Sequence, residues 1–500
     1  MKEKKPAIGN ITIAPSVNAK FKPEQYKIMK IRHYDIEINT DNPFLNCKLE
    51  REPYAVILTE LVKNFNDGFV LAIDSEWGTG KTTFVKMWKQ YLENNGFKTL
   101  YFNAWENDFG NDILVTLISE LEELKSSKNE TAFKSVLSKA APLAKSLALG
   151  LFKTQVEKYV GNDFVKEVSD QTTSTIADSL QEQITNYTAR KNSINEFQIS
   201  LQKFVSSTTD EKPVVFIIDE LDRCRPNYAV ELLENIKHLF HVPGVTFVLS
   251  IDKIQLGNAV RGVYGSDLID ANEYLRRFID IEYSLPEPDI KLFVKYLYEY
   301  FGFNEFFRGE QRLQCREFQQ DGSNFIDFAT SLFKKERLTL RVQEKIFAHA
   351  RIVLTQFSAN AYVVPSLFVL LIYCKFKHKD FYNNLKNMNY TLQELTNQVE
   401  KILPDNVSED EIHMYLYTIS MLLRSYNNSR EYREKEKFTI RDKSDESQKL
   451  NFISKFDKSK NNERLLSFFN SNREFSSNIY DLRIINLIKK IDITETIVIN

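Results

Sequence analysis

Short, uninterrupted apolar runs alternate with stretches of helical periodicity through the first half of the chain. Runs of this kind are typical of strands covered by helices on both faces, because neither face then meets solvent. The runs lie at residues 69–73, 99–102, 214–218, 245–251 and 279–283, and a helical pattern over 54–66 leads into the first. Strands that alternate with helices along the sequence indicate a parallel sheet, so we expect an α/β domain.

Two departures from this alternation divide the chain further. The interval between the second and third runs is far longer than one crossover, and its apolar residues recur at helical spacing, which predicts a helical insert at about 111–204. Pro286 and Pro288 end the alternation, and the pattern beyond them is mainly helical. The expected organisation is an α/β domain over 41–288 and a helical domain over 289–500.

Segments without sustained periodicity complete the chain. Residues 1–40 mix charge, proline and polar side chains and are expected to form a mobile arm. Residues 427–462 are densely charged with few large apolar side chains, which predicts an exposed or mobile segment. Two apolar stretches, 140–152 and 362–374, are shorter than the roughly 20 residues of a spanning helix. We expect buried or amphipathic helices there and no integral membrane span.

Composition narrows the class of protein. Hydrophobic residues make up 43% of the 500, which is enough for a large core and two or three domains. The 66 basic residues balance 68 acidic ones, so net charge predicts neither nucleic-acid nor membrane binding, and a local basic patch stays open. The four cysteines form no C-x-x-C pair and the N-terminus has no apolar signal-peptide core, which favours a reducing, cytoplasmic location.

A glycine-containing turn after the first apolar run has the composition of a phosphate-binding loop. Its residues are Ser75, Glu76, Trp77, Gly78, Thr79, Gly80, Lys81, Thr82 and Thr83. Backbone N–H groups of such a loop converge on phosphate oxygens at a helix N-terminus, where the helix dipole favours anions. Lys81 is expected to reach the β- and γ-phosphates of a nucleotide, and the Thr82 hydroxyl to ligate Mg2+. Ser75 stands where the usual pattern has glycine, so a positive φ there is expected to be costly.

Acidic residues follow the third apolar run directly, in the order Asp219, Glu220, Leu221, Asp222 and Arg223. A buried strand that delivers acids at its carboxyl end, beside a phosphate loop, is suited to holding Mg2+. We expect Asp219 to bind the metal and Glu220 to orient or deprotonate the attacking water. Asp222 has three open roles, as a second base, a metal partner or the salt-bridge mate of Arg223.

These and other segments resemble the KAP family of P-loop NTPases. They occur in the family's order, cover about residues 41–375, and read Asp41-Asn-Pro-Phe, Trp77-Gly-Thr-Gly-Lys-Thr, Phe102-Asn-Ala-Trp-Glu, Ile217-Ile-Asp-Glu-Leu-Asp-Arg-Cys224, Phe247-Val-Leu-Ser-Ile-Asp252 and Tyr274-Leu-Arg-Arg-Phe-Ile-Asp280. The resemblance implies a P-loop NTPase with a five-stranded parallel sheet in the order 5-1-4-3-2, a helical insert and a helical C-terminal domain folding over the nucleotide. The insert carries lysine where many members have transmembrane helices, so the chain looks like a soluble member.

The resemblance also implies residues that sense the γ-phosphate. The candidates are Ser250 or Asp252 after the fourth strand, and Arg276 and Arg277 before the fifth. Arginine suits this role because its planar fork stabilises charge on the transferring group, from its own chain or a neighbour's. Arg341 resembles the arginine that the helical domain of related ATPases points at the nucleotide.

Simpler roles for some of these residues stay open. Arg276 and Arg277 could be solvated, or paired with an acid among Asp270, Glu273 and Asp280. Trp105 is expected to pack in the core rather than to shape the site, because a tryptophan just after a strand usually packs. The histidines show no zinc-ligand spacing.

Mg2+-dependent ATP hydrolysis that drives a conformational change or assembly is the function these features favour. ATP rather than GTP, a homo-oligomer, and a role in phage defence beside a partner effector protein are what the family resemblance implies. The alternative is a nucleotide-binding scaffold or signalling switch with little hydrolysis. A kinase is a third class, but no lid-like arginine cluster follows the loop.

Overall fold

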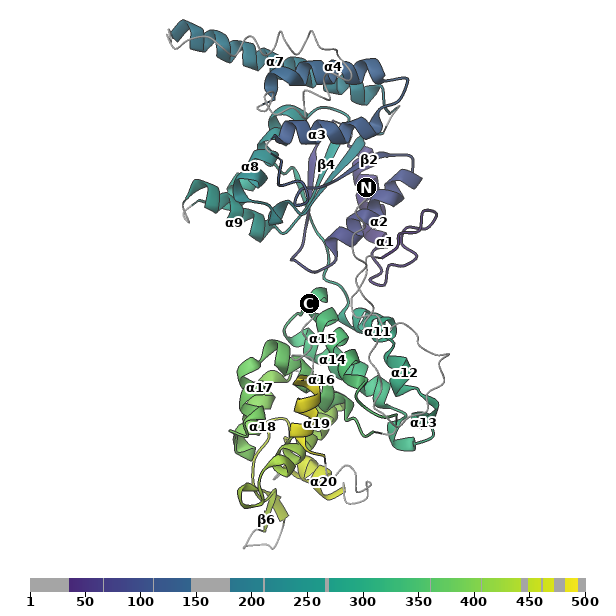
Figure 1. The fold of residues 1–500 in the computed structure, drawn as a ribbon, viewed down its shortest axis with the longest axis vertical. Helices are drawn as coiled ribbons and strands as arrows, with labels where there is room; N and C mark the ends of the chain where they lie inside the picture. Colours follow the sequence, from purple (N-terminus) through teal and green to yellow (C-terminus); the bar gives the residue numbers. More distant parts are fainter. Residues whose placement is uncertain are drawn as a thin grey trace, which may run out of the picture.

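The computed structural model describes residues 36–65, 67–110, 112–144, 180–209, 212–265, 269–359, 361–405, 407–441, 448–459, 462–471 and 482–492. Most of the expected N-terminal arm, residues 145–179 of the expected insert and 442–447 of the charged segment lie outside these ranges. Figure 1 shows an α/β region above, which holds β2, β4, α2 and α8, and a helical region below, in which α11 is the first helix along the chain.

The α/β region is built on a parallel sheet whose strand order is β2-β3-β4-β1-β5. Read from the other edge this is the expected order 5-1-4-3-2, which is therefore confirmed. Observed strand ends differ by at most two residues from the expected ones. The strands are β1 Val70–Asp74, β2 Lys98–Asn103, β3 Val214–Asp219, β4 Val245–Ile251 and β5 Ile281–Ser284.

Helices cover both faces of the sheet because its side chains alternate between two apolar cores. Leu71 and Ile73 of β1 face one core, formed with α1 (Glu52–Asn64) and α2 (Lys81–Asn94). Val70 and Ala72 face the other. That second core is closed by α3 Ile113–Leu121, α8 Pro226–Asn235, α9 Lys253–Tyr264 and α10 Ala271–Leu275. The continuous apolar runs of the sequence thus correspond to strands covered on both sides.

The described part of the insert is helical. After α3 and the short turns around it, α4 (Glu130–Ala140) packs along α7 (Leu180–Ser206), and the pair lies across the top of the sheet in Figure 1. Phe133 of α4 and Phe204 of α7 meet with ring centroids 5.3 Å apart. The insert therefore joins the sheet's own core rather than forming a separate one.

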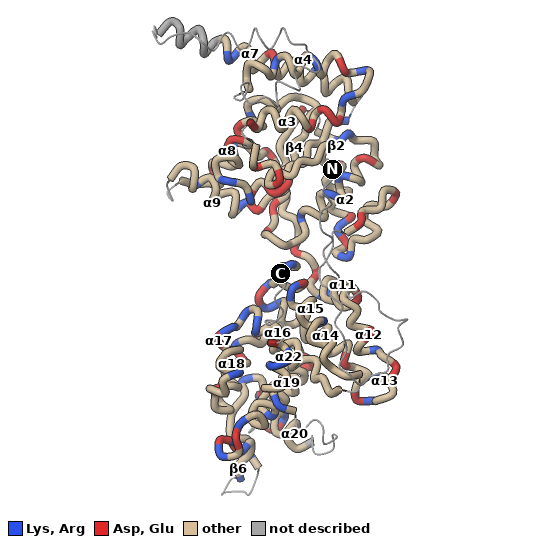
Figure 2. Tube along the Cα trace, viewed as in Figure 1, with Lys and Arg blue, Asp and Glu red and all other residues tan. Residues whose placement is uncertain are grey.

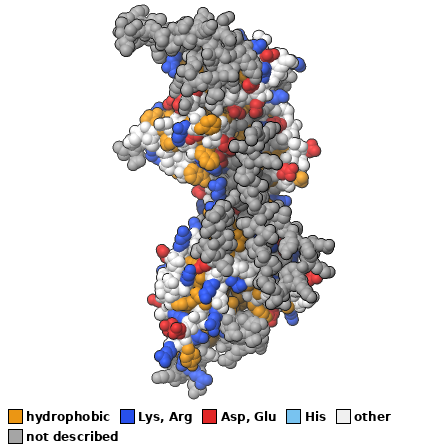
Figure 3. All heavy atoms as spheres, viewed as in Figure 1, with side chains coloured by type: hydrophobic (Ala, Val, Ile, Leu, Met, Phe, Trp, Pro, Cys, Tyr) orange, Lys and Arg blue, Asp and Glu red, His pale blue; other side chains and the backbone are white. Residues whose placement is uncertain are grey.

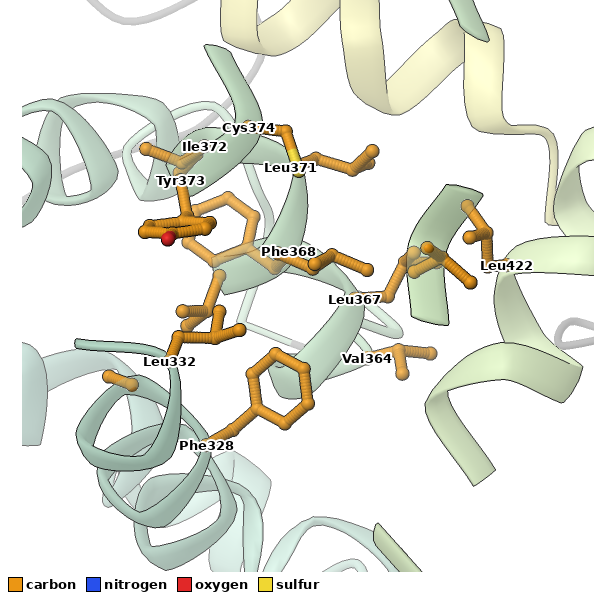
Figure 4. Packing of buried hydrophobic residues seen from close by; sticks show 14 of the residues in the cluster. Phe328, Leu332, Val364, Leu367, Phe368, Leu371, Ile372, Tyr373, Cys374 and Leu422 are labelled. Carbon is orange, nitrogen blue, oxygen red and sulfur yellow. The ribbon is translucent and has the colours of Figure 1, made fainter. Parts of the chain in front are cut away.

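The helical region packs around α16 (Pro365–Lys377), whose residues from Pro365 to Cys374 are all buried. Figure 4 shows Leu367, Phe368 and Leu371 of α16 beside side chains of the surrounding helices. Within the described residues no helix is long and apolar enough to cross a membrane. The other helices are α11 Ile290–Tyr300, α12 Phe303–Phe307, α13 Glu310–Leu313, α14 Asp321–Lys335, α15 Leu340–Leu354, α17 Lys379–Lys386, α18 Leu392–Ile402, α19 Glu409–Ser429, α20 Glu463–Ser471 and α22 Ile484–Asp492.

The charged stretch 427–462 differs from the exposed segment that was expected. Its described part holds an antiparallel pair, β6 (Thr439–Arg441) and β7 (Gln448–Leu450), followed by buried Phe452 and Phe456. Buried Glu400 of α18 accepts hydrogen bonds from the Lys455 main-chain N–H at 3.0 and 3.2 Å. Two buried aromatic residues and the buried Glu400 carboxylate thus attach this segment to the helical region, although its many charged residues predicted that it would be exposed to solvent.

Charge is mixed over the surface. Figure 2 shows basic and acidic residues interspersed along both regions, in agreement with the balanced composition. Figure 3 shows hydrophobic side chains on the left of the upper region. Ile254 and Tyr264 of α9 are among the exposed large hydrophobic residues.

Candidate functional site

Side chains at the carboxyl ends of neighbouring strands form one row. In the sheet register Asn103 lies opposite Asp219, and Asp219 lies opposite Ser250. A cavity of about 710 Å³, the strand-end cavity, opens along this row. Of the residues expected in the site it is lined by Trp77, Gly78, Gly80, Lys81, Thr82, Thr83, Asp219, Glu220, Asp222, Ser250 and Arg341. Elements far apart in the sequence are therefore brought together around one hollow.

The glycine loop, residues 75–80, joins β1 to α2 and needs two glycines. Gly78 and Gly80 have φ of 80° and 88°, a region that other residues rarely adopt. Ser75 is not among the described non-glycine residues with positive φ, so the expected cost at that position is wrong. Its hydroxyl instead donates to Thr79 Oγ1 at 2.8 Å, and Thr79 Oγ1 donates to the Glu76 carbonyl at 2.9 Å. Ser75 therefore links the start of the glycine loop to Thr79 near its end by a side-chain hydrogen bond.

Lys81 begins α2 and is almost fully buried at the cavity wall. Its ammonium donates to the main-chain carbonyls of Ser75 and, at 3.0 Å, Glu76. Burial lowers the pKa of Lys81, and Asp222, Asp252 and Asp219 oppose that effect through their charges. The lysine is thus a cation held inside its own loop, next to the acids at the strand ends.

Asp219 and Glu220 occupy the end of β3 in different ways. Asp219 is 1% exposed, and its carboxylate accepts the Tyr101 hydroxyl at 2.9 Å. Burial, followed by the charge of Asp219, raises the pKa of Tyr101, so the phenol stays a donor. Glu220 has φ 61°, a backbone conformation that non-glycine residues rarely adopt, and it lines the cavity.

The carboxylate of Glu220 is held from two sides. Arg223 pairs with its Oε1 at 2.6 Å, and the Asn103 amide reaches its Oε2 at 3.4 Å. Burial raises the pKa of Glu220, while the charge of Arg223 opposes the rise. Arg223 therefore belongs to Glu220, and the expected alternative in which it pairs with Asp222 is not what the structure shows.

Asp222 contacts the glycine loop instead. Its carboxylate accepts the indole N–H of Trp77, and burial raises the pKa of Asp222 against the effects of Trp77 and Lys81. Asp252, which directly follows β4, also contacts the glycine loop, because its carboxylate accepts the Trp77 main-chain N–H at 3.2 Å. The same carboxylate caps α9 by accepting the N–H groups of Ile254 and Gln255. Both acids fix the position of Trp77.

Ser250 carries a buried hydroxyl with no hydrogen-bond partner among the described residues. An unpaired buried polar group is costly unless a ligand or water satisfies it. The hydroxyl belongs to a residue that lines the strand-end cavity, so a bound ligand or water there could supply the missing partner.

The helical region reaches the glycine loop at the start of α15. The Leu340 N–H donates to the Gly78 carbonyl at 2.9 Å. A Cβ on Gly78 would lie 3.2 Å from Thr339 and 3.4 Å from Arg341, so a larger residue would press on these neighbours, and the φ of 80° favours glycine as well. Arg341 is thereby placed at the cavity.

Arg276 and Arg277 lie at the other end of the sheet. Shortly after them, Asp280 accepts the N–H of Val70, the first residue of β1, whereas the glycine loop follows the last residue of that strand. The ends of β1 are about 13 Å apart at the usual rise per residue. Arg276 pairs with Glu273, and neither arginine lines the cavity. The structure does not bring them to the site of their own chain.

Trp105 and Arg51 are among the cavity-lining residues that the sequence did not place in the site. Trp105 is 55% exposed and lines the cavity, so the expected core packing is wrong. An aromatic residue after a strand has the same pattern whether it packs or borders a cavity. Arg51 also lines the cavity and donates to the loop carbonyls of Thr79 and Gly80. Its partners are main-chain atoms, which leave no signal in the sequence.

Residues 51–489 match the sequence family described as KAP family P-loop domain. No curated protein matches the chain. Among solved structures, the chain is similar to the ORC2 protein of Aeropyrum pernix, described as ADPNP-ADP complexes, with 10% sequence identity and a TM-score of 0.29. That alignment covers 89% of this chain and 95% of the other. The family match includes most of the residues that line the strand-end cavity and most of the helical region.

Proposed function

The chain belongs to the KAP family of P-loop domains, and from this membership we propose that it binds ATP in the strand-end cavity and hydrolyses it with Mg2+. The observation that carries the proposal is the placement of Lys81 and Thr82 around the same cavity as Asp219 and Glu220. In this proposal residues 41–288 form the nucleotide-binding domain and 289–500 the helical domain.

The donor atoms fit a nucleotide-bound Mg2+. No group of three or more His, Cys, Asp or Glu residues in the described ranges could hold a metal ion alone. Mg2+ is usually bound by one or two carboxylates together with phosphates and waters, so such a protein cage is not needed. The Asp219 carboxylate and the Thr82 hydroxyl would hold it, and the unpaired Ser250 hydroxyl fits a phosphate oxygen or water. Bound there, Mg2+ would neutralise charge on the β- and γ-phosphates.

Glu220 is the proposed base of the reaction. Its carboxylate would orient the attacking water and accept a proton from it, for which it must leave the ion pair with Arg223. Lys81 would exchange the carbonyls of Ser75 and Glu76 for phosphate oxygens. Arg341 would add charge from the helical side. The nucleotide would thus rearrange two existing interactions, one at Lys81 and one at Glu220.

The activity should have an acid limb set by Glu220. A base must be ionised, so kcat is expected to fall as pH drops through the pKa of Glu220, which burial raises above 4.5. Removing the opposing charge with Arg223→Gln should move this limb to higher pH. The check is kcat against pH from 4.5 to 8 at saturating ATP for both proteins. An unmoved limb would show that Arg223 does not control the ionisation of the base.

A homo-oligomer belongs to the proposal, because Arg276 and Arg277 could reach only a neighbour's cavity. The Arg276→Ala/Arg277→Ala double variant and the Glu220→Gln variant are each expected to have little turnover. Mixed in equal amounts they should recover about a quarter of wild-type turnover, since one site in four would combine an intact base with intact neighbouring arginines. Arg261→Ala on α9 is the control and should stay active. Full activity of the double variant alone would contradict the role in trans.

The test of the function is phosphate release by the purified full chain with ATP or GTP, with Mg2+ or with chelator. Turnover with Mg2+ that chelator abolishes is expected. Tight ATP binding without phosphate release would instead favour the alternative, a nucleotide-binding scaffold or switch. Adding DNA and candidate partner proteins to the assay tests the finer proposal of an effector partner, which rests on family resemblance, as does the proposed role in phage defence.

A further inference from the structure

Arg51 is a buried cation whose described partners are both main-chain carbonyls. It is 3% exposed and lies just before α1. Its Nη2 donates to the Thr79 carbonyl at 2.9 Å and its Nη1 to the Gly80 carbonyl at 3.2 Å. Burial lowers the pKa of Arg51 to about 10, so the side chain stays charged at neutral pH. Within the described ranges it forms no ion pair with a carboxylate, and its charge is therefore directed at the glycine loop.

The two carbonyls determine where two amide groups point. In a trans peptide the C=O and the following N–H point in opposite directions, and the described chain has no cis peptide bonds. The Thr79 carbonyl shares a peptide with the Gly80 N–H, and the Gly80 carbonyl shares one with the Lys81 N–H. Because Arg51 holds both carbonyls, both N–H groups point away from it. These are amides of the loop expected to bind phosphate.

The backbone around Arg51 holds its side chain against the glycine loop. Glu50, directly before it, has φ 52°, a conformation that non-glycine residues adopt only when their surroundings impose it. α1 then starts at Glu52, with Pro53 in its first turn. A Cβ on Gly80 would lie 3.3 Å from Arg51 Nη1, so the guanidinium packs directly against the loop backbone.

We propose that Arg51 is a positioning residue that pre-orients the glycine loop, so that the Gly80 and Lys81 N–H groups face the phosphates before the nucleotide arrives. This inference rests on the proposed nucleotide binding but not on hydrolysis. Without Arg51 the loop would populate other conformations, and nucleotide affinity falls by the fraction of loops that are competent. ATP and ADP should lose affinity by the same factor, because both place a β-phosphate in the loop.

The experiment compares Arg51→Met and Arg51→Lys with wild type in the full chain. Arg51→Met keeps a long, unbranched side chain but has no donor, and we expect the Kd of ATP and of ADP to rise about tenfold or more each. kcat at saturating ATP should stay within about twofold, because Glu220 is untouched. Arg51→Lys should lie between, since one ammonium cannot imitate the fork. Binding is measured by calorimetry, and KM and kcat by phosphate release.

Arg351 provides the matched control. It is also a buried arginine that donates to a carbonyl, that of Phe301 at 2.9 Å, but it lies in the helical region away from the loop. Arg351→Met should lose stability without changing either Kd. Unchanged affinities in a folded Arg51→Met protein would overturn the proposal. A loss confined to ATP would also overturn it, since Arg51 would then act on the γ-phosphate itself.

A readout without nucleotide separates this inference from the proposed function. Hydrogen exchange of the peptide containing residues 76–84 should be faster in Arg51→Met than in wild type or Arg351→Met, with no ligand present. If wild type binds nucleotide without hydrolysing it, the proposed function fails while the affinity test still stands. Equal exchange in all three proteins contradicts pre-orientation whatever the nucleotide results. If Arg51→Met does not fold, the same comparison is made with Arg51→Lys.

Discussion

Replacing Glu220 by glutamine is expected to lower kcat for ATP hydrolysis by about 10²–10⁴-fold, the usual contribution of a general base. Glutamine has nearly the same shape and can keep a hydrogen bond to Asn103, but it cannot accept a proton from water. The ion pair with Arg223 is lost as well, so the variant carries one uncompensated cation beside the cavity. ATP affinity should therefore be retained or raised, and the protein should accumulate with ATP bound.

The measurement is single-turnover hydrolysis together with the ATP and ADP content of the purified complex. Glu234→Gln, an exposed acid on α8 downstream of the same segment, is the matched control and should keep wild-type kcat. Unchanged turnover in Glu220→Gln would remove Glu220 from the mechanism. Asp222 would then be the acid to examine, since it lines the same cavity.

Replacing Lys81 by methionine is expected to weaken ATP binding by about 100-fold or more, the loss of a charge-assisted contact to phosphate. Wild-type Lys81 is buried with its ammonium on two loop carbonyls, and burial already lowers its pKa. Methionine suits the buried position better than the cation does. Thermal stability without nucleotide should thus be kept, while stabilisation by added ATP should disappear.

The melting temperature with and without Mg2+ and ATP measures both effects in one experiment. Lys89→Met is the matched control. Lys89 lies on the same helix, outside the cavity, and pairs with Glu93 at 2.6 Å. The variant should be stabilised by ATP as much as wild type. A Lys81→Met protein that ATP still stabilises fully would show that the nucleotide does not occupy the glycine loop.

The strands of the sheet could be predicted because parallel strands buried on both faces consist of continuous apolar residues. β4, expected at 245–251, was predicted to the residue, whereas β5 begins two residues later than its run. β5 is an edge strand with alternating half-buried and exposed side chains, so its pattern is weaker. The strand order came from family resemblance, since pairing joins residues far apart in the chain.

The site could be predicted only where the chemistry lies in side chains. Lys81, Asp219 and Glu220 follow from their motifs, and the structure places them around one cavity. Arg276 and Arg277 follow from a motif too, but they precede the start of β5. That start lies at the end of the sheet opposite to the cavity. Asp222 and Asp252 both contact Trp77, and no spacing rule predicts a contact between three different loops.

The hydrogen bond between Leu340 and Gly78 couples any movement of the glycine loop to the orientation of α15. The helix has 15 residues and is about 22 Å long, so a tilt of about 5° at its first turn moves its far end by about 2 Å. Just beyond that far end, the Gln356 side-chain amide donates to the Lys490 carbonyl at 3.0 Å, and the Lys490 ammonium donates to the Gln356 carbonyl at 2.7 Å, which joins the end of α15 to α22. A small displacement of the loop is thus amplified before it reaches the last described helix of the chain.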